Sequence, residues 1–292
     1  MRIRDLLVSQ RNNNAIALKC VDKAISFNEW NTMSKDMSET LHEYCKDSLC
    51  VGVFLPNSLE YAISYFAVMF LNKILIPIGV QSKELEINST VNYHEIDLVI
   101  TNSEYLNFLI NSLQLTDYKK YIYNCTTNEL VCIHNQLEFI NKTNDLIPQW
   151  TDDDVAIMLH TSGTTSNPKR VMLTHSNLIN NIESNIASLG LNSDNRMLIA
   201  LPMFFGYCNS AQFLTQLYIG GISVIFDVIF MPKKFFELVQ KEKITMFVAV
   251  PSMLLMILDY KYAYNYDYCS LKYMFWWRRN AKGEIKAADE QL

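Results

Sequence analysis

Glycine is scarce in this chain, with only 8 among 292 residues. Because glycine adopts backbone conformations that other residues avoid, a chain with so few is expected to keep them where a turn requires them. We therefore single out Gly163, Gly206, Gly220 and Gly221 as candidate backbone necessities. Neither a Gly/Ser linker nor an internal repeat is visible, so the sequence marks no clean domain boundary.

Positive charge is not in excess either. The chain has 25 Lys and Arg residues against 30 Asp and Glu, a formal net charge of -5, and no long basic run. This balance argues against nucleic acid or an anionic membrane surface as the main partner. It still permits a nucleotide bound at one local site.

Long uninterrupted apolar runs are also missing. Polar residues break the two most apolar regions, 60–80 and 197–231, so neither supplies the roughly 20 residues of a membrane span. Seven irregularly spaced cysteines do not suit a disulfide framework, and the first residues contain no apolar stretch typical of a signal peptide. These features predict buried strands and helices, no membrane span, reduced thiols and a cytoplasmic location.

What the chain does contain is a regular alternation of short β-branched runs with longer amphipathic segments. This rhythm predicts an α/β fold, with layered, mainly parallel sheets flanked by helices. The predicted strands are 50–55, 74–78, 98–101, 155–160, 197–201, 222–226 and 246–250. The predicted helices are 28–44, 58–72, 176–189 and 232–241, and residues 112–149 are predicted to be a peripheral connection.

The segment 155–178 has the most distinctive chemistry: an apolar strand, a turn dense in hydroxyls, a lysine, a second short strand and a helix. Glycine at the turn lets the backbone approach an anion, and successive N–H groups there form an anion-binding concavity. Hydroxyls add donors, and a lysine adds a charge-assisted hydrogen bond. The predicted phosphate-binding residues are Thr161, Ser162, Gly163, Thr164, Thr165 and Lys169.

A solvated turn and a P-loop are the two other interpretations of this segment. Ser and Thr favour solvated turns in any protein, but an unbroken hydroxyl and glycine run closed by Pro-Lys is too particular for that account. A P-loop needs glycine directly before the lysine and Ser or Thr directly after it. Here Pro168 precedes Lys169 and Arg170 follows it, so the P-loop interpretation fails.

The turn resembles the phosphate signature of the adenylate-forming superfamily, which includes acyl-CoA synthetases, adenylation domains of peptide synthetases and luciferase-like ligases. Ser166 and Arg170 depart from it, since glycine is usual at both places. The resemblance extends over about 26–275, so residues 1–275 are interpreted as an incomplete large N-terminal domain. Later segments, LPMFFGYCNS, GGISVIF and FVAVPSM, resemble those that wall the family's carboxylate pocket.

This resemblance implies a function and a set of ligands. Intact relatives use ATP and Mg²⁺ to convert a carboxylate, fatty, other acyl or amino acid, into an acyl-adenylate, and pass it to a thiol of CoA or a carrier protein. Phe204, Phe205 and Gly206 are implied to line the acid pocket, Phe205 standing where many members have histidine. Core packing of these aromatic side chains is an equal alternative.

Other candidate residues give weaker indications of a functional site. Cys125, Cys132 and His134 are metal-capable types without the paired spacing of a zinc site, so no metal ligand is predicted. His160 and His175 flank the phosphate turn. His175 is predicted to cap the following helix or face solvent, and no catalytic residue is assigned.

The last stretch departs from the family pattern. Trp276 and Trp277 stand where the family has a glycine-rich turn beside the substrate. Because Trp-Trp is encoded TGG TGG, a shift of one base gives Gly-Gly, so we interpret 276–292 as a frameshifted tail. The family's later magnesium and ribose ligands and its C-terminal lid domain are then absent, which predicts that this chain alone is inactive. The alternatives are a non-catalytic nucleotide-binding remnant, or pseudogene product, and an active half that needs a separate lid protein.

Overall fold

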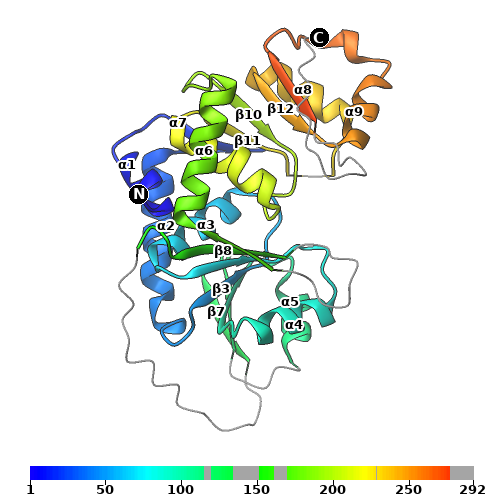
Figure 1. The fold of residues 1–292 in the computed structure, drawn as a ribbon. Helices are drawn as coiled ribbons and strands as arrows, with labels where there is room; N and C mark the ends of the chain where they lie inside the picture. Colours follow the sequence, from blue (N-terminus) through cyan, green and yellow to red (C-terminus); the bar gives the residue numbers. More distant parts are fainter. Residues whose placement is uncertain (115–119, 134–150, 161–169, 228, 277–292) are drawn as a thin grey trace. The chain divides into compact units, whose positions relative to one another are not determined.

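The computed structural model describes residues 1–114, 120–133, 151–160, 170–227 and 229–276. They form two compact units (Figure 1). The first unit comprises Met1–Asn12, Asn28–Pro56 and Glu60–Asn180, and the second Asn13–Phe27, Asn57–Leu59 and Asn181–Leu292. Each unit has its own largely parallel sheet with helices, so the predicted α/β class is confirmed.

The first unit is built on a seven-stranded sheet of order β7-β6-β5-β3-β4-β8-β9. Strands β6, β5, β3, β4 and β8 run parallel, while β7 and β9 pair antiparallel at the two edges. The strands are β3 (Cys50–Val53), β4 (Ile74–Pro77), β5 (Leu98–Thr101), β6 (Lys120–Asn124), β7 (Glu129–Ile133), β8 (Val155–His160) and β9 (Arg170–Thr174). The helices are α1 (Ile3–Ser9), α2 (Phe27–Leu41), η1 (His42–Tyr44), α3 (Leu59–Phe70), α4 (Glu84–Tyr93), α5 (Leu106–Leu113) and the start of α6 (His175–Leu189).

Helix α3 explains the first apolar region of the sequence. It is apolar on every side, as expected for a helix that is covered all round, and Tyr61, Tyr65 and Phe66 are each 0% exposed. Trp30 of α2 packs edge-on against Phe66 and donates its indole N–H to the carbonyl oxygen of Ala62. Among the described residues, no helix has the length and apolarity needed to cross a membrane.

The second unit contains a six-stranded sheet of order β13-β12-β10-β11-β1-β2, parallel except for the β1–β2 hairpin. Its strands are β1 (Ile16–Cys20), β2 (Lys23–Ser26), β10 (Arg196–Ile199), β11 (Ile222–Ile225), β12 (Met246–Ala249) and β13 (Tyr273–Trp276). Its helices are η2 (Cys208–Leu214), α7 (Thr215–Ile219), α8 (Pro232–Glu242), α9 (Pro251–Leu258) and η3 (Ala263–Asn265). Helices α8 and α9 both begin with proline, whose fixed φ suits the first helical position.

An aromatic cluster holds α8 against this sheet. Phe235 of α8 is 0% exposed and its ring centroid lies 4.7 Å from that of Phe247 in β12. Phe230 stacks on Phe247 at 5.9 Å and on Phe226 at 5.6 Å. The cluster therefore includes β12, the strand that precedes residues 250–258.

Most predicted elements are present, with shifts of one to three residues at their ends. All seven predicted strands and all four predicted helices have counterparts, and β5 and β8 match their predicted bounds. The prediction for 112–149 is wrong in part, because β6 and β7 lie within it and extend the first sheet. Lys120, the first residue of β6, is buried and pairs with Asp97. Because a charged residue is not typical of a buried strand, the sequence pattern did not predict β6.

Two of the singled-out glycines have the expected backbone role. Gly220 ends α7 in the left-handed region, with φ of 71°. A Cβ at Gly221 would lie 2.8 Å from the carbonyl oxygen of Asn195 and 2.2 Å from Oε1 of Gln216.

We expect Gly221→Ala to lower the free energy of unfolding by about 1–3 kcal/mol, because the added methyl forces backbone and side chain apart. Urea denaturation measures the change. Gly190→Ala is the matched control, since a Cβ there meets nothing within 4 Å and only the left-handed φ of 61° is strained. A smaller loss for Gly221→Ala than for Gly190→Ala would contradict the packing explanation.

Candidate functional site

The predicted phosphate turn joins two paired strands of the first unit. Thr161, Ser162, Gly163, Thr164, Thr165 and Lys169 lie outside the described residues, as does Ser166. Both ends of the turn are described: His160 ends β8, Arg170 begins β9, and the two are opposite each other in the antiparallel register. The predicted strands on both sides of the turn and the helix after the second strand are therefore confirmed.

The two residues that flank the turn lie at the edge of the sheet where α/β proteins bind ligands. Strand β8 runs parallel to β4, which runs parallel to β3. His160 is at the carboxyl end of β8 and Arg170 is paired with it, so both lie at the same sheet edge as the carboxyl ends of β3 and β4. Open α/β sheets bind their ligands outside this edge.

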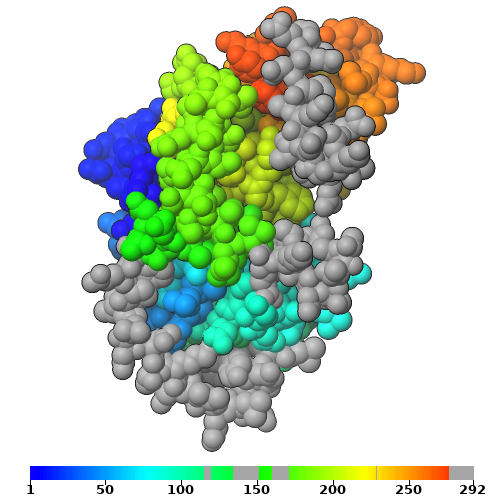
Figure 2. Space-filling view, in the orientation of Figure 1, coloured from blue at the N-terminus to red at the C-terminus, as the bar shows by residue number. Residues whose placement is uncertain are grey.

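Helix α6 begins directly after β9, and its start is capped by side chains. The backbone N–H of Asn177 donates to Oγ1 of Thr174 at 3.1 Å, and the N–H of Thr174 donates to Oδ1 of Asn177 at 3.2 Å. In Figure 2 the light-green surface of α6 is in view, and several of its residues are exposed. This cap at the start of α6 determines where β9 ends.

The prediction for His175 is wrong. Thr174 and Asn177 provide the cap, and His175 is only 6% exposed. Its Nδ1 accepts a hydrogen bond from the backbone N–H of Ile3 at 3.2 Å. Burial, and secondly the charge of Arg2, lower the pKa of His175 to about 4.

A separate candidate site, for the acid, follows β10 in the second unit. The chain leaves β10 toward β11 on one side and leaves β12 toward β13 on the other, so the connections diverge between β10 and β12. A crevice outside the carboxyl ends of such strands is the usual ligand position. Residues 200–207 follow β10 there, and residues 250–258 follow β12.

Phe204, Phe205 and Gly206, predicted to line the acid pocket, lie in the connection after β10. The rings of Phe204 and Phe205 are 4.4 Å apart, and Phe205 is 50% exposed. Core packing therefore does not account for Phe205, while Phe204 is half-buried. Tyr207 is also exposed, at 44%.

Sequence reasoning missed the residue that holds this connection. Asn57 donates through Nδ2 to the carbonyl oxygen of Leu201 at 2.9 Å, and its Oδ1 accepts the N–H of Met203 at 2.7 Å. In the sequence, Pro56 and Asn57 directly precede the predicted helix 58–72 and indicate only a helix start. Its second role depends on a segment more than 140 residues away and has no local signal.

The connection continues into a π-helix, η2. Single π-helical turns are uncommon and are frequent at functional sites. Cys208 donates through its thiol to the carbonyl oxygen of Leu201 at 3.3 Å, and burial raises its pKa, so it stays protonated. Oγ1 of Thr215 donates to the carbonyl oxygen of Ser210 at 2.8 Å. This hydrogen bond gives a partner to one backbone carbonyl of the π-helix.

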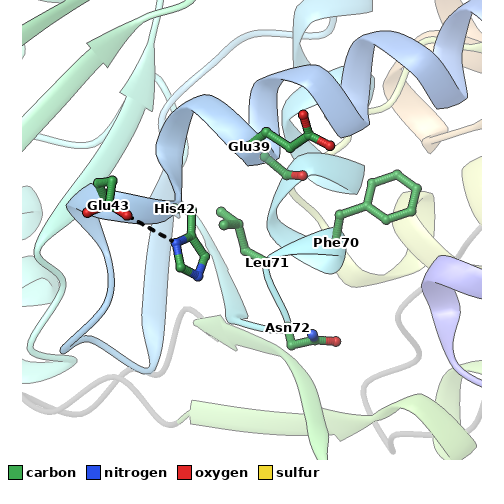
Figure 3. A pocket seen from close by; sticks show the side chains of 7 residues that line it. Glu39, His42, Glu43, Phe70, Leu71 and Asn72 are labelled. Atoms are coloured by element: carbon green, nitrogen blue, oxygen red, sulfur yellow. Dashed lines mark ion pairs between the residues drawn. The ribbon is translucent and has the colours of Figure 1, made fainter.

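A shallow pocket of about 450 Å³ lies elsewhere on the first unit (Figure 3). It is lined by Ser38, Glu39, His42, Glu43, Phe70, Leu71 and Asn72. These residues precede β3 and β4, so the pocket lies at the amino edge of the parallel strands. His42 and Glu43 are 64% and 66% exposed, and Nδ1 of His42 lies 3.6 Å from Oε1 of Glu43. The opposite edge and the high exposure separate this pocket from the predicted phosphate site.

Metal binding has no support within the described part of the chain. No group of three or more His, Cys, Asp or Glu side chains is placed to hold an ion among those residues. Cys125 and Cys132 are free thiols, and His134 lies outside the described residues. Burial raises the pKa of Cys125 to about 12, which disfavours the thiolate that metal ions require.

Comparison with known proteins identifies the family. The model of the family described as AMP-binding enzyme matches residues 8–286. The chain belongs to the AMP-binding enzyme family. The resemblance seen in the phosphate turn and the later segments is thereby confirmed for nearly the whole chain.

Named members of the AMP-binding enzyme family share the sequence and the fold. The chain is 27% identical over 238 residues to 4-coumarate:CoA ligase 1 of Petunia hybrida, which covers 76% of this chain and 41% of that protein. It matches the anthranilate CoA ligase AuaEII in complex with anthranoyl-AMP with a TM-score of 0.78 at 18% identity, covering 94% of this chain and 53% of that one. The N-terminal domain of FACL13 from Mycobacterium tuberculosis also has a TM-score of 0.78, at 17% identity, covering 94% of this chain and 69% of that one. The chain thus has the fold of the N-terminal domain and spans about 41% of the length of the curated relatives it matches.

Proposed function

We propose that this chain carries the ATP-phosphate turn and the acid-binding segment of an AMP-forming acid–CoA ligase. In the complete reaction a carboxylate oxygen of the acid attacks the α-phosphorus of ATP, the bond to the β-phosphate oxygen breaks, and pyrophosphate leaves. The thiol of CoA or of a carrier protein then attacks the acyl carbon, loses its proton and releases AMP. The observation that supports the proposal best is the position of His160 and Arg170, which flank the turn and pair at the carboxyl end of β8, the ligand edge of the first sheet.

Each residue of the turn has a defined task in this proposal. Gly163 leaves room for the phosphates, and the hydroxyls of Thr161, Ser162, Thr164 and Thr165 donate to their oxygens. Lys169 supplies positive charge against the triphosphate, in a reaction that depends on charge stabilisation. Mg²⁺ is expected to neutralise phosphate charge when bound, but the described residues offer no cluster to hold it, so we assign it no ligand.

The acid is proposed to have an uncharged, apolar or aromatic tail. The segments after β10 and β12, 200–207 and 250–258, contain no Asp, Glu, Lys or Arg. An amino acid needs a carboxylate partner for its ammonium group, and neither segment supplies one. Exposed Phe205 and Tyr207 offer aromatic surface instead. The coumarate and anthranilate named for the relatives have aromatic rings, in agreement with this choice.

We expect Phe205→Ala to weaken binding of 4-coumarate about 10- to 100-fold, because burying one large apolar side chain contributes about 1.5–3 kcal/mol. ATP affinity should not change. Isothermal titration calorimetry of the purified chain with each ligand measures both. Tyr264→Ala, at a position 77% exposed in the same unit, is the control. Unchanged 4-coumarate affinity in Phe205→Ala would remove Phe205 from the proposed pocket.

A non-catalytic nucleotide-binding remnant is the second candidate, because Ser166 and Arg170 stand in the turn where glycine is usual. Carboxylate-dependent exchange between ATP and pyrophosphate separates the two. Exchange well above a no-acid control would show catalysis by this chain alone, contrary to the prediction from sequence. ATP binding without exchange would support the remnant or a requirement for a separate lid protein.

The interpretation of 276–292 as a frameshifted tail stays a prediction. Trp276 ends β13, where it lies opposite Ala249 of β12, and residues 277–292 lie outside the described residues. Nucleotide sequence across the codon for Phe275 and the following few hundred bases tests it. An intact frame with no ligase-like coding sequence downstream would contradict the interpretation.

A further inference from the structure

The buried contact between α1 and His175 has no part in the proposed ligase chemistry. Helix α1 packs with Ile3, Leu6 and Leu7 buried, at 0%, 4% and 0% exposed. Its first residue, Ile3, donates its backbone N–H to Nδ1 of His175 at 3.2 Å, in a buried position. A histidine nitrogen accepts a hydrogen bond only when it carries no proton, so His175 is neutral with its proton on Nε2.

His175 lies where both strands of the phosphate-turn hairpin have their base. Its backbone N–H donates to the carbonyl oxygen of Asp154 at 3.1 Å, directly before β8. The N–H of Ser176 donates to the carbonyl oxygen of Asp152 at 2.8 Å. His175 itself follows β9 directly, so this one residue joins α1, through its side chain, to the segments at the base of both strands, through its backbone.

Charged groups surround this contact on both sides. From the N-terminal segment come Arg2, Asp5 and the terminal ammonium group, which pairs with the carboxylate of Asp152. From the hairpin side come Asp152 and Asp154. Arg2 and Arg4 also donate to Oδ1 of Asn72, at 3.0 and 2.7 Å, which anchors the start of α1 to the turn before β4.

Protonation would turn this contact from attractive to repulsive. A proton on Nδ1 removes the acceptor of a buried N–H and places two donors face to face, and a buried unsatisfied donor is strongly unfavourable. The three carboxylates raise the pKa of His175, but burial and Arg2 dominate and lower it to about 4. The neutral form therefore stabilises the docked helix.

We propose that the Ile3–His175 contact is an acid-sensitive attachment, which releases α1 from the base of the β8–β9 hairpin when His175 takes up a proton. A His175 released to solvent has an ordinary pKa of about 6.5. Docking is then fully favoured above about pH 6.5 and weakens as the pH falls from there toward 4. The attachment does not depend on the ligase function, since neither ATP nor an acid takes part in it.

Hydrogen–deuterium exchange of residues 3–9 in the whole chain, corrected for intrinsic exchange, tests the proposal between pH 7.5 and 4.5. We expect protection of α1 to fall by about 10-fold for each pH unit below 6.5, on the order of 100-fold overall, while β5 stays protected. In His175→Gln, the amide oxygen accepts the same hydrogen bond without titrating. The loss of α1 protection between pH 7.5 and 4.5 should therefore be at least 10-fold smaller in this variant than in the original chain. His42→Gln, at an exposed position, should behave like the original chain.

NMR titration of the histidines in the unmodified chain gives a second measurement, independent of any variant. The sequence has 5 histidines, and one is expected to titrate near pH 4. The proposal is overturned if all five titrate near 6.5, or if α1 loses protection equally in His175→Gln and in the original chain.

Discussion

Replacing Lys169 with alanine is expected to weaken ATP binding about 10- to 100-fold. A hydrogen bond to a charged group contributes about 1.5–3 kcal/mol, and each 1.4 kcal/mol is a factor of ten in affinity. Lys169 is the one lysine of the turn, so no neighbour within the turn replaces its charge. Calorimetric titration of ATP at fixed salt measures the loss, which should shrink as the salt concentration rises.

Lys35→Ala is the matched control, because it removes the same charge from an exposed position on α2. It should leave ATP affinity within about twofold, since an exposed charge far from the ligand is screened by salt. If Lys169→Ala and Lys35→Ala bind ATP equally well, the turn is not the phosphate site. The proposed ligase function would then lose its principal support.

Replacing Phe235 with alanine is expected to have the largest effect on stability. The side chain is 0% exposed and contacts the rings of Phe230, Phe236 and Phe247. Truncating a buried phenylalanine lowers the free energy of unfolding by about 3–5 kcal/mol, through lost burial and the cavity that remains. Urea denaturation followed by circular dichroism measures the change.

The same variant tests whether the aromatic cluster supports the acid-binding segment. Phe247 lies in β12, and residues 250–258 follow that strand directly. We expect 4-coumarate affinity to fall in Phe235→Ala under conditions where the chain is still folded. Leu255→Ala is the control for a large apolar residue that is exposed, at 61%, and should change the free energy of unfolding by less than about 0.5 kcal/mol.

Elements with a strong local pattern were predicted well from the sequence. Strands β5 and β8 are short, β-branched and apolar, and their predicted bounds are the observed ones. Helix α8 starts at Pro232, a residue suited to the first helical position. In these segments local propensity and burial favour the same structure.

Elements that depend on distant partners were missed. Strand β1 pairs in parallel with β11, about 200 residues later in the chain, and β6 begins with the buried Lys120. The π-helix η2 carries buried polar residues, Asn209 and Gln212, which a helical pattern of apolar residues does not predict. Neither the pairing of strands distant in the sequence nor the π-helix can be predicted from the local residue composition.

The sequence by itself determined the α/β class and the family, because strands, helices and family motifs depend on residue type and short spacing. The phosphate-binding role of the turn from Thr161 to Lys169 stays a prediction from the sequence. Only the tertiary structure decided that Asn57 holds the segment of Phe204 and Phe205, and that His175 is buried against α1 instead of capping α6. A hydrogen bond between residues more than 140 positions apart is set by how the sheets bring them together. No local pattern encodes that distance.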